Sequence, residues 1–337
     1  MPPNRRLTID AYAEGVFRGD RVVLARAITL VESELASDAP LAAALLDRLL
    51  PHAGRSCRVG VSGVPGAGKS TFIDALGMHL VHDRGERVAV LSVDPSSPVS
   101  GGSILGDKTR MDRLALEERA FIRPSPARGH LGGVARRTRE TIVLCEAAGY
   151  ENILVETVGV GQSETAVRSM TDFFLLLLIA GAGDELQGIK RGILEMVDAI
   201  AVNKADGDNV ERASRTRAEY AAALHLFAAS PDGWTPRVHT CSARTGAGIA
   251  ALWDLVLEHR AEMEASGFLA ERRRRQALDW MRELVSVGLE RRFRDHPAVA
   301  ERLPAVERAV VAGTTSSFAA ARELLSLFTS HLSGEDV

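Results

Sequence analysis

Seven short apolar runs, each separated from the next by a stretch with helical periodicity, follow one another between Cys57 and Ala243. Several of these runs are apolar throughout and lack the alternation that a sheet with one solvated face shows. Strands that alternate with helices in this way are typical of a parallel sheet covered on both faces. The sequence therefore predicts an α/β protein with a mostly parallel, doubly wound sheet, whose strands are expected at 58–63, 87–94, 120–125, 152–157, 173–180, 197–204 and 237–243.

Helical segments flank this region on both sides. Residues 8–52 have helical periodicity in two or three segments, with Asp20 and Asp38 placed as N-caps and Pro51 as a stop. Beyond the last strand, helices are expected at 249–265, 268–293 and 298–331. The predicted organisation is an N-terminal helical extension (1–55), a sheet domain (56–262) and a C-terminal helical segment (263–337).

Composition and charge argue against several classes of protein. A net charge of −3 gives no reason to expect nucleic-acid or membrane binding, and the apolar run 173–180 is too short for a membrane helix. Three cysteines, far apart and without paired spacing, indicate neither disulfides nor a zinc site, so a reducing cytoplasm is expected. The first dozen residues lack a signal-peptide pattern, and export is not expected.

The first strand runs directly into a glycine-rich loop, Gly63 to Ser70, which is followed by a helix. This is the P-loop pattern in the context that it requires: backbone N–H groups wrap phosphates, and the helix N-terminus favours their charge. Lys69 is expected to reach the β and γ phosphates, and Ser70 to offer its hydroxyl to Mg²⁺. The nucleotide-binding residues expected here are Gly63, Val64, Pro65, Gly66, Ala67, Gly68, Lys69, Ser70 and Thr71.

A second motif, Asn203-Lys204-Ala205-Asp206, stands at the end of the sixth strand. The carboxylate of Asp206 can accept from the ring N–H and the exocyclic amine of guanine, whereas adenine would leave it desolvated and unpaired. After the seventh strand, the stretch Cys241-Ser242-Ala243-Arg244 resembles the loop whose backbone contacts the guanine carbonyl in GTPases, and Ser242, Ala243 and Arg244 are its expected nucleotide-binding residues. The two motifs predict a GTP site, with GDP as product.

Acidic residues are placed where a P-loop protein holds magnesium. Glu156 ends the fourth strand, at the position of a Walker B acid, although an ordinary strand-end acid explains it equally well when it is taken alone. Gly159 follows it at the third place, where its N–H can approach the γ-phosphate. Asp94 and Asp107 lie in a small, polar loop segment and are suited to bind Mg²⁺ waters or to orient the attacking water.

Only four of the 41 basic residues are lysines, namely Lys69, Lys108, Lys190 and Lys204. Lysine carries a compact point charge, whereas arginine carries a planar fork, so a narrow site that needs the former cannot exchange them. The scarcity predicts that all four lysines occupy functional positions.

The blocks GVPGAGKST, VDPSSP, GGSILGDKTRM, IRPSP, ETVGVGQSE, GAGDELQGIKRGI and NKAD together resemble the MeaB/ArgK family of GTPases associated with methylmalonyl-CoA mutase. The resemblance spans roughly residues 20 to 295 and implies a GTP-hydrolysing chaperone of an adenosylcobalamin-dependent mutase, which gates cofactor loading and protects or reactivates the mutase. It also implies a homodimer to which the C-terminal helices contribute, and the cobalamin adenosyltransferase as a further partner.

The resemblance also assigns roles to residues. It implies that Asp94, Asp107 and Glu156 form the acidic set around Mg²⁺ and the attacking water, with Lys69 completing the catalytic group. The segment 181–192 matches a switch that reports the nucleotide state to the mutase. The residues expected to couple the site to the partner are Lys108, Gln162, Asp184, Glu185, Gln187 and Lys190.

Three other functions remain open from the sequence: a protein kinase linked to arginine and ornithine transport, a metal-insertion GTPase for nickel enzymes, and a switch that binds GTP without useful hydrolysis. The arginine run 272–275 is expected to form a solvated or interface helix face. The apolar stripe from Leu278 to Leu289 fits either an intramolecular core or a dimer contact.

Overall fold

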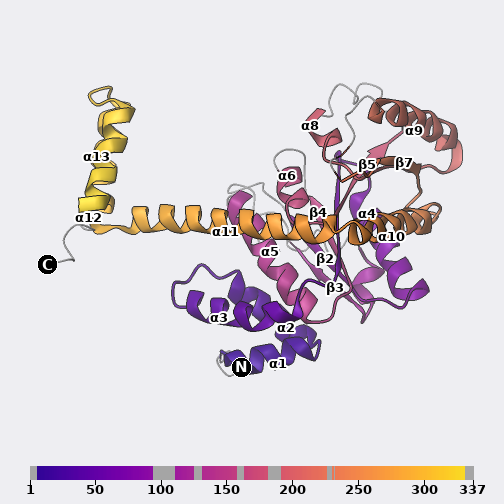
Figure 1. The fold of residues 1–337 in the computed structure, drawn as a ribbon, viewed down its shortest axis with the longest axis horizontal. Coiled ribbons are helices and arrows are strands. Elements are labelled where there is room, and N and C mark those ends of the chain that lie inside the picture. Colours follow the sequence, from indigo (N-terminus) through magenta and orange to yellow (C-terminus); the bar gives the residue numbers. More distant parts are fainter. Residues whose placement is uncertain are drawn as a thin grey trace. The chain divides into compact units, whose positions relative to one another are not determined.

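The computed structural model describes residues 6–93, 111–124, 131–157, 163–180, 191–225, 230 and 232–330 (Figure 1). The chain divides into two compact units, residues 1–273 and residues 274–337. Every strand that the described residues form belongs to the first unit.

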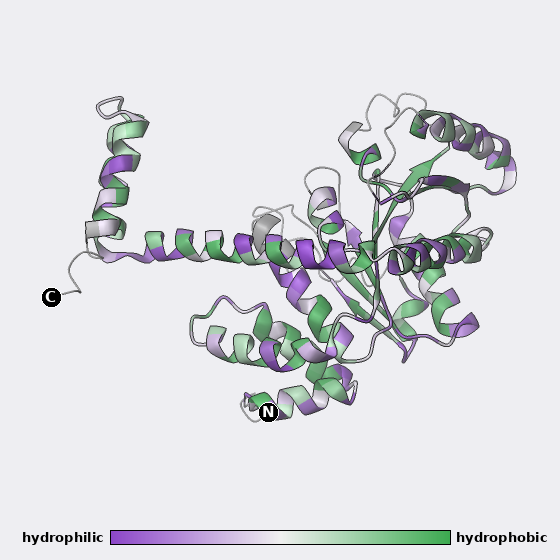
Figure 2. Cartoon of the chain, in the orientation of Figure 1, coloured by the Kyte–Doolittle hydropathy of each residue, from purple (hydrophilic) through white to green (hydrophobic). Residues whose placement is uncertain are grey.

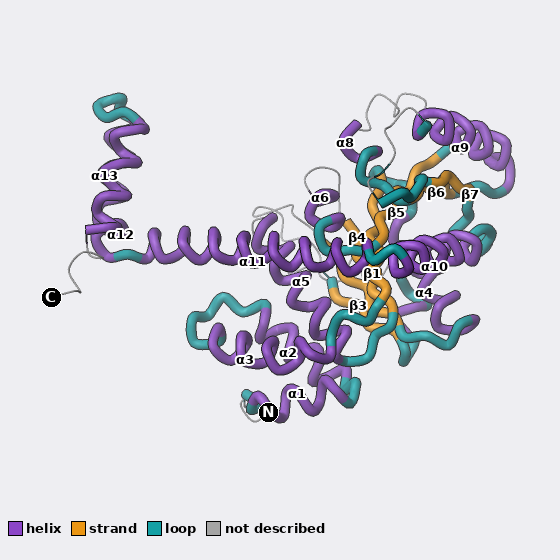
Figure 3. The backbone as a smooth tube through the Cα atoms, viewed as in Figure 1, coloured by secondary structure: helices purple, strands orange, loops and turns teal. Residues whose placement is uncertain are grey.

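A seven-stranded sheet lies at the centre of the first unit (Figure 3). Its strands are β1 (Cys57–Gly63), β2 (Val88–Val93), β3 (Ala120–Arg123), β4 (Asn152–Thr157), β5 (Phe173–Ile179), β6 (Ala199–Asn203) and β7 (Arg237–Thr240). Each overlaps one of the predicted runs, and every pair of neighbours is parallel. The predicted α/β fold is confirmed.

The strand order is β3-β2-β4-β1-β5-β6-β7. After β1 the chain forms β2 and β3 on one side, returns with β4 to the position between β2 and β1, and then continues outward through β5, β6 and β7 on the other side. In open sheets of this kind, ligands bind outside the carboxyl ends of the strands, where the order reverses. That point lies beside β1, and the loop that follows β1 is the predicted P-loop.

Both faces of the sheet are buried, which explains why the strands read as unbroken apolar runs (Figure 2). Along β5, Phe174 and Leu176 belong to one core, and Phe173 and Leu175 belong to the other. Helices α5 (Leu131–Ala147), α6 (Ser163–Arg168) and α9 (Val210–Leu224) cover the first face; α4 (Lys69–Met78) and α10 (Ile249–Ala265) cover the second. No described helix is long and apolar enough to cross a membrane.

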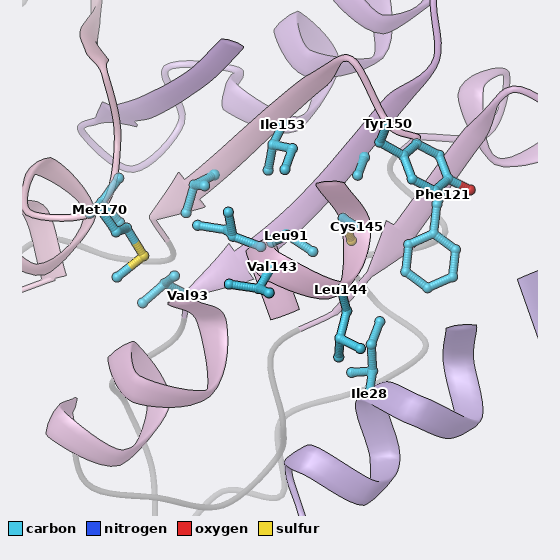
Figure 4. Packing of buried hydrophobic residues seen from close by; sticks show 14 of the residues in the cluster. Ile28, Leu91, Val93, Phe121, Val143, Leu144, Cys145, Tyr150, Ile153 and Met170 are labelled. Carbon is cyan, nitrogen blue, oxygen red and sulfur yellow. The ribbon is translucent and has the colours of Figure 1, made fainter. Parts of the chain in front are cut away.

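The N-terminal helices α1 (Ile9–Phe17), α2 (Arg21–Val31) and α3 (Ala39–Leu49) share one core with the sheet. Figure 4 shows Ile28 of α2 beside Leu144 of α5, both fully buried. Burying a side chain of this size stabilises the fold by about 1.5–3 kcal/mol, so these helices are integral to the first unit.

The two predicted N-caps have different outcomes. The carboxylate of Asp20 accepts from the backbone N–H groups of Val22 and Val23, as an N-cap should. Asp38 precedes α3 but makes no cap bond; it accepts from the Ser33 hydroxyl at 2.6 Å and pairs with Arg6. Asp38 therefore occupies the predicted N-cap position, but its carboxylate bonds to Ser33 and Arg6 instead of to the helix N–H groups.

The second unit contains most of α11 (Phe268–Asp295), which begins in the first unit, together with α12 (Pro297–Val311) and α13 (Ser317–Ser330). The single helix predicted at 298–331 is wrong. Gly313 adopts a left-handed φ of +69° between α12 and α13, and the break allows their apolar faces to pack against each other through Val299, Val306, Ala320 and Leu324.

Shorter helical turns connect the main elements. They are Leu50–His52, which contains Pro51 just after the end of α3, His79–Asp83, Leu114–Leu116, α8 (Arg191–Leu194) and Gly207–Asn209.

The first residues of the arginine run are anchored rather than solvated. Arg273 donates from Nε and Nη2 to the two oxygens of buried Asp172, at 2.9 and 2.6 Å. Arg272 donates from Nη2 to Asp232 at 2.6 Å. Burial, the largest single effect, raises the pKa of Asp172, but the hydrogen bonds and charges of Arg273 and Arg58 together outweigh it and hold that pKa below its usual range. The expectation of a solvated or interface face is wrong for these two residues.

Candidate functional site

The P-loop joins the end of β1 to the start of α4, as predicted. Gly68, the residue before α4, has a left-handed φ of +82°, which a side chain would strain. A Cβ built on Gly68 would also stand 2.9 Å from the side-chain nitrogen of Asn203. Glycine is required here because the loop passes directly against the second motif.

Lys69 begins α4, and its side chain turns back over the loop. Its ammonium donates to the carbonyl oxygens of Gly63 at 2.7 Å and Val64 at 3.4 Å. The charge therefore lies over the concave loop, within which backbone N–H groups are suited to bind phosphate.

Ser70 and Glu156 come together although they stand on different elements. The hydroxyl of Ser70, in the first turn of α4, donates to a carboxylate oxygen of Glu156 at 2.9 Å. Glu156 is only 4% exposed, and β4 pairs with β1 so that Glu156 lies opposite Val61. A hydroxyl and a carboxylate so placed at the phosphate loop are the hard oxygen donors that Mg²⁺ prefers, so this pair fits the metal.

The side chain of Asn203 bridges the phosphate loop and the loop after β7. Its amide nitrogen donates to the carbonyl of Ala67 at 2.8 Å. Its oxygen accepts from the backbone N–H of Ala243 at 3.1 Å and from the thiol of Cys241 at 3.6 Å. Asn203 is 1% exposed, so these partners rather than water fix its amide.

Asp206 is oriented by Ser242. The hydroxyl of Ser242, which is fully buried, donates to one carboxylate oxygen of Asp206 at 2.5 Å and accepts from the N–H of Thr245 at 3.2 Å. Such a bond to an ionised carboxylate is among the stronger hydrogen bonds in proteins. The other oxygen of Asp206 makes no hydrogen bond among the described residues.

Lys204 stands between these two side chains in an unusual backbone conformation. Its φ is +60°, and among the described residues it is the one non-glycine residue with a positive φ. The side-chain amide of Asn209 donates to its carbonyl at 2.8 Å and supports the turn. Strain of this kind persists where the surrounding structure demands it, and here it keeps Asn203 and Asp206 in place on either side.

The remaining predicted nucleotide residues of the two loops lie where the motifs place them. Pro65, Gly66 and Thr71 are exposed around the phosphate loop, and Arg244 is exposed beyond Ala243. The predicted residues that lie outside the described part of the chain are Asp94, Asp107, Lys108, Gly159, Gln162, Asp184, Glu185, Gln187 and Lys190.

Cys241 belongs to the stretch that resembles the guanine loop, but no role was predicted for its side chain, which contacts Asn203. The available signal was its place directly before Ser242 at the end of a strand. Burial raises the pKa of the Cys241 thiol to about 12, so it is a neutral donor at physiological pH. Among the described residues, no group of three or more histidine, cysteine or acidic side chains is placed to hold a metal ion.

Comparisons with known proteins show the family to which the chain belongs. The family model described as Methylmalonyl Co-A mutase-associated GTPase MeaB matches residues 24–298. A Putative GTPase of Caulobacter vibrioides is 52% identical over 322 residues, covering 96% of this chain and 98% of that protein. The mitochondrial Methylmalonic aciduria type A homolog of Mus musculus is 49% identical over 332 residues, covering 96% and 80%. The crystal structure of LAO/AO transport system kinase has a TM-score of 0.74 at 38% identity, covering 96% of this chain and 99% of that one.

Proposed function

Because the chain belongs to the family of methylmalonyl-CoA mutase-associated GTPases, we propose that it uses GTP binding and Mg²⁺-dependent hydrolysis to act as a chaperone of an adenosylcobalamin-dependent methylmalonyl-CoA mutase. The observation that carries the nucleotide assignment is the Asp206 carboxylate, which Ser242 holds beside the P-loop. The mutase assignment is supported by the family and by the name of the mouse relative.

Catalysis by this site consists mainly of positioning and charge neutralisation, as phosphoryl transfer requires little covalent chemistry from the protein. The ammonium of Lys69 leaves the carbonyls of Gly63 and Val64 to neutralise the β and γ phosphates, which the loop amides hold in place. Ser70 and Glu156 would hold Mg²⁺, together with Asp94 and Asp107. Bound there, the metal would supply positive charge that offsets the negative charge developing on the phosphate oxygens.

Guanine is selected by the carboxylate of Asp206, which Ser242 orients and whose second oxygen accepts no hydrogen bond from the described residues. The two donors on the edge of guanine satisfy this carboxylate, whereas adenine leaves a desolvated charge unpaired. The stem of Lys204 lies along the phosphate loop, near Gly68, and forms one side of the base pocket.

Nucleotide state reaches the partner through the segments that contain Lys108, Gly159, Gln162 and the group Asp184, Glu185, Gln187 and Lys190. We expect these segments to respond to the presence of the γ-phosphate, as the switch segments of GTPases do. The mutase responds to the change in these segments, and the protein thereby gates cofactor loading and protects or reactivates the mutase. The cobalamin adenosyltransferase is a second partner, and the complex operates in the cytoplasm.

Residues 263–337 serve as the dimerisation arm. Leu278, Met281, Val285 and Leu289 follow one face of α11 at spacings of three and four, and each is 51–54% exposed. An apolar stripe of this kind is stabilised when a second copy covers it. Light scattering is expected to give a dimer for the wild type and a monomer when Met281 and Val285 are both changed to glutamate.

The experiment that tests the main proposal combines co-purification with the mutase and GTP hydrolysis in its presence. We expect a complex whose stability differs between GDP and a non-hydrolysable GTP analogue, and a hydrolysis rate that the mutase increases. With γ-labelled GTP, the label should appear as free phosphate; label on a protein would instead favour the kinase. Neither a complex nor a rate change would refute the chaperone role.

A further inference from the structure

The oxygen of the Asn203 side chain accepts two hydrogen bonds, one from a backbone N–H and one from a thiol. The first donor is Ala243, at 3.1 Å, and the second is Cys241, at 3.6 Å between sulfur and oxygen. A carbonyl oxygen has two lone pairs, so both donors can be satisfied at once. The amide of Asn203 is thus held from two positions on the same loop.

Cys241 is itself fixed by the backbone around it. Its N–H donates to the carbonyl of Val202 at 2.9 Å, and its carbonyl accepts from the N–H of Ala205 at 2.9 Å. A Cβ built on Gly248 would come within 3.3 Å of the Cys241 Cβ, so the start of α10 packs closely against it. The backbone and Cβ of Cys241 are therefore fixed beside Asn203, within reach of its side-chain oxygen.

The orientation of the Asn203 amide matters because its other end holds the phosphate loop. Its nitrogen donates to the carbonyl of Ala67 at 2.8 Å, immediately before Gly68. An amide that rotated by half a turn would place its oxygen against the Ala67 carbonyl and lose its hydrogen bonds with Ala67, Ala243 and Cys241. At 1% exposure for Asn203 and 2% for Cys241, water cannot replace the missing bonds.

We propose that Cys241 is a positioning residue of the guanine site, whose thiol holds the Asn203 amide in the orientation that keeps the guanine loop joined to the phosphate loop. When GTP binds, the N–H of Ala243 is drawn from the Asn203 oxygen toward the guanine carbonyl. The thiol of Cys241 continues to donate to the Asn203 oxygen, so that oxygen keeps a hydrogen bond. This role rests on the proposed guanine site and deepens it. Because the thiol is neutral, it donates its hydrogen without placing a charge beside the base.

Two matched pairs of variants test this role. Cys241→Ser and Cys241→Thr keep a hydrogen-bond donor, whereas Cys241→Ala and Cys241→Val remove it at nearly the same side-chain volume within each pair. The rate at which a fluorescent GDP analogue dissociates is measured for all four, together with kcat and KM for GTP and the melting temperature. A net hydrogen bond of 0.5–1.5 kcal/mol corresponds to about a 2- to 12-fold change.

We expect dissociation and KM to increase by about 3- to 10-fold in the alanine and valine variants, with kcat within about twofold of wild type. The serine and threonine variants should remain close to wild type. Equal dissociation rates for threonine and valine, and for serine and alanine, would overturn the proposal. Failure of the wild type to bind the GDP analogue would instead refute the guanine site itself, and the two failures are thus distinguishable. A change that follows melting temperature rather than the donor would also overturn it.

Discussion

The hydroxyl of Ser242 donates to the carboxylate of Asp206 across 2.5 Å, joining the loop after β7 to the loop after β6. The bond leaves one carboxylate oxygen of Asp206 unpaired among the described residues and fixes the direction in which it points. Each carboxylate oxygen can accept more than one hydrogen bond, so Asp206 can keep its bond from Ser242 and still accept from both donors of guanine. Recognition of guanine therefore depends on both residues, although only Asp206 would contact the base through its side chain.

Asp206→Asn should change the preferred base from guanine to xanthine. An amide at this position offers a donor, and xanthine has a carbonyl where guanine has its exocyclic amine. We expect kcat/KM to decrease about 100-fold for GTP and to increase for XTP, measured as phosphate release. Ser242→Ala is the companion variant: it should weaken GTP binding about 10-fold without creating a preference for XTP. Equal turnover of ATP and GTP by the wild type would contradict the guanine assignment.

Lys69→Ala should reduce kcat/KM for GTP by about 100- to 1000-fold, because it removes the charge placed over the phosphate loop.

Ser70→Ala tests Mg²⁺ binding independently of nucleotide binding. This variant should need a several-fold higher Mg²⁺ concentration for half-maximal hydrolysis, while its affinity for GDP in EDTA stays at the wild-type value. An unchanged Mg²⁺ dependence would argue against a magnesium role for the Ser70–Glu156 pair.

Lys108→Arg and Lys190→Arg should impair GTP turnover or its stimulation by the mutase by at least about threefold, because a guanidinium cannot replace a compact ammonium in a confined site. The reverse exchange at an exposed residue, Arg215→Lys, is the matched control and should have no effect; the Arg215 side chain is 77% exposed. Wild-type behaviour of both lysine variants would mean that the scarcity of lysine carries no functional information.

Arg273→Met should destabilise the first unit by about 3 kcal/mol, because it leaves the carboxylate of Asp172 buried without its main partner. Urea unfolding measures the change. Arg215→Met breaks an exposed pair with Glu211, at 3.7 Å, and should cost less than about 1 kcal/mol. Similar losses for the two variants would show that the Arg273 pair contributes no more than a surface contact.

The folded protein should lose stability as the pH falls below about 6.5, the ordinary pKa of histidine, in part through His259. Burial lowers the pKa of His259; the acids Asp198 and Asp232 oppose this effect, and the cations Arg272 and Arg168 add to it. Below pH 6.5 the unfolded chain binds a proton that the folded chain does not yet accept. The free energy of unfolding therefore decreases as the pH falls toward the lower pKa of the folded state, and below that pKa His259 causes no further loss. His259→Gln should show a smaller difference in melting temperature between pH 7.5 and pH 5.5. An identical pH dependence in both proteins would exclude His259 as a contributor.

Local sequence was sufficient for the elements and for the chemistry carried on consecutive residues. The runs such as Phe173–Ile179 are apolar on both faces because helices cover both, and this pattern is present before any folding takes place. The P-loop and the Asn203–Asp206 motif are likewise local, since a glycine-rich turn or a short loop determines the direction of its own backbone groups.

Contacts between distant residues required the tertiary structure. The prediction of one helix over 298–331 missed the turn at Gly313, because the break is stabilised by packing between α12 and α13 rather than by the turn residues alone. The sequence predicted a solvated or interface face for Arg272 and Arg273 because their acidic partners are far away along the chain. Asp172, for example, precedes Arg273 by 101 residues.

The sequence by itself determined that this chain forms a parallel α/β sheet with a phosphate loop and a guanine motif, since periodicity and turn chemistry act over a few residues. Only the tertiary structure decided the strand order and the pairing of Ser70 with Glu156. It alone also decided that the thiol of Cys241 and the phosphate loop both form hydrogen bonds with the side chain of Asn203. The physical reason is that a hydrogen bond requires two groups within about 3 Å, and the sheet brings side chains more than a hundred residues apart to that distance.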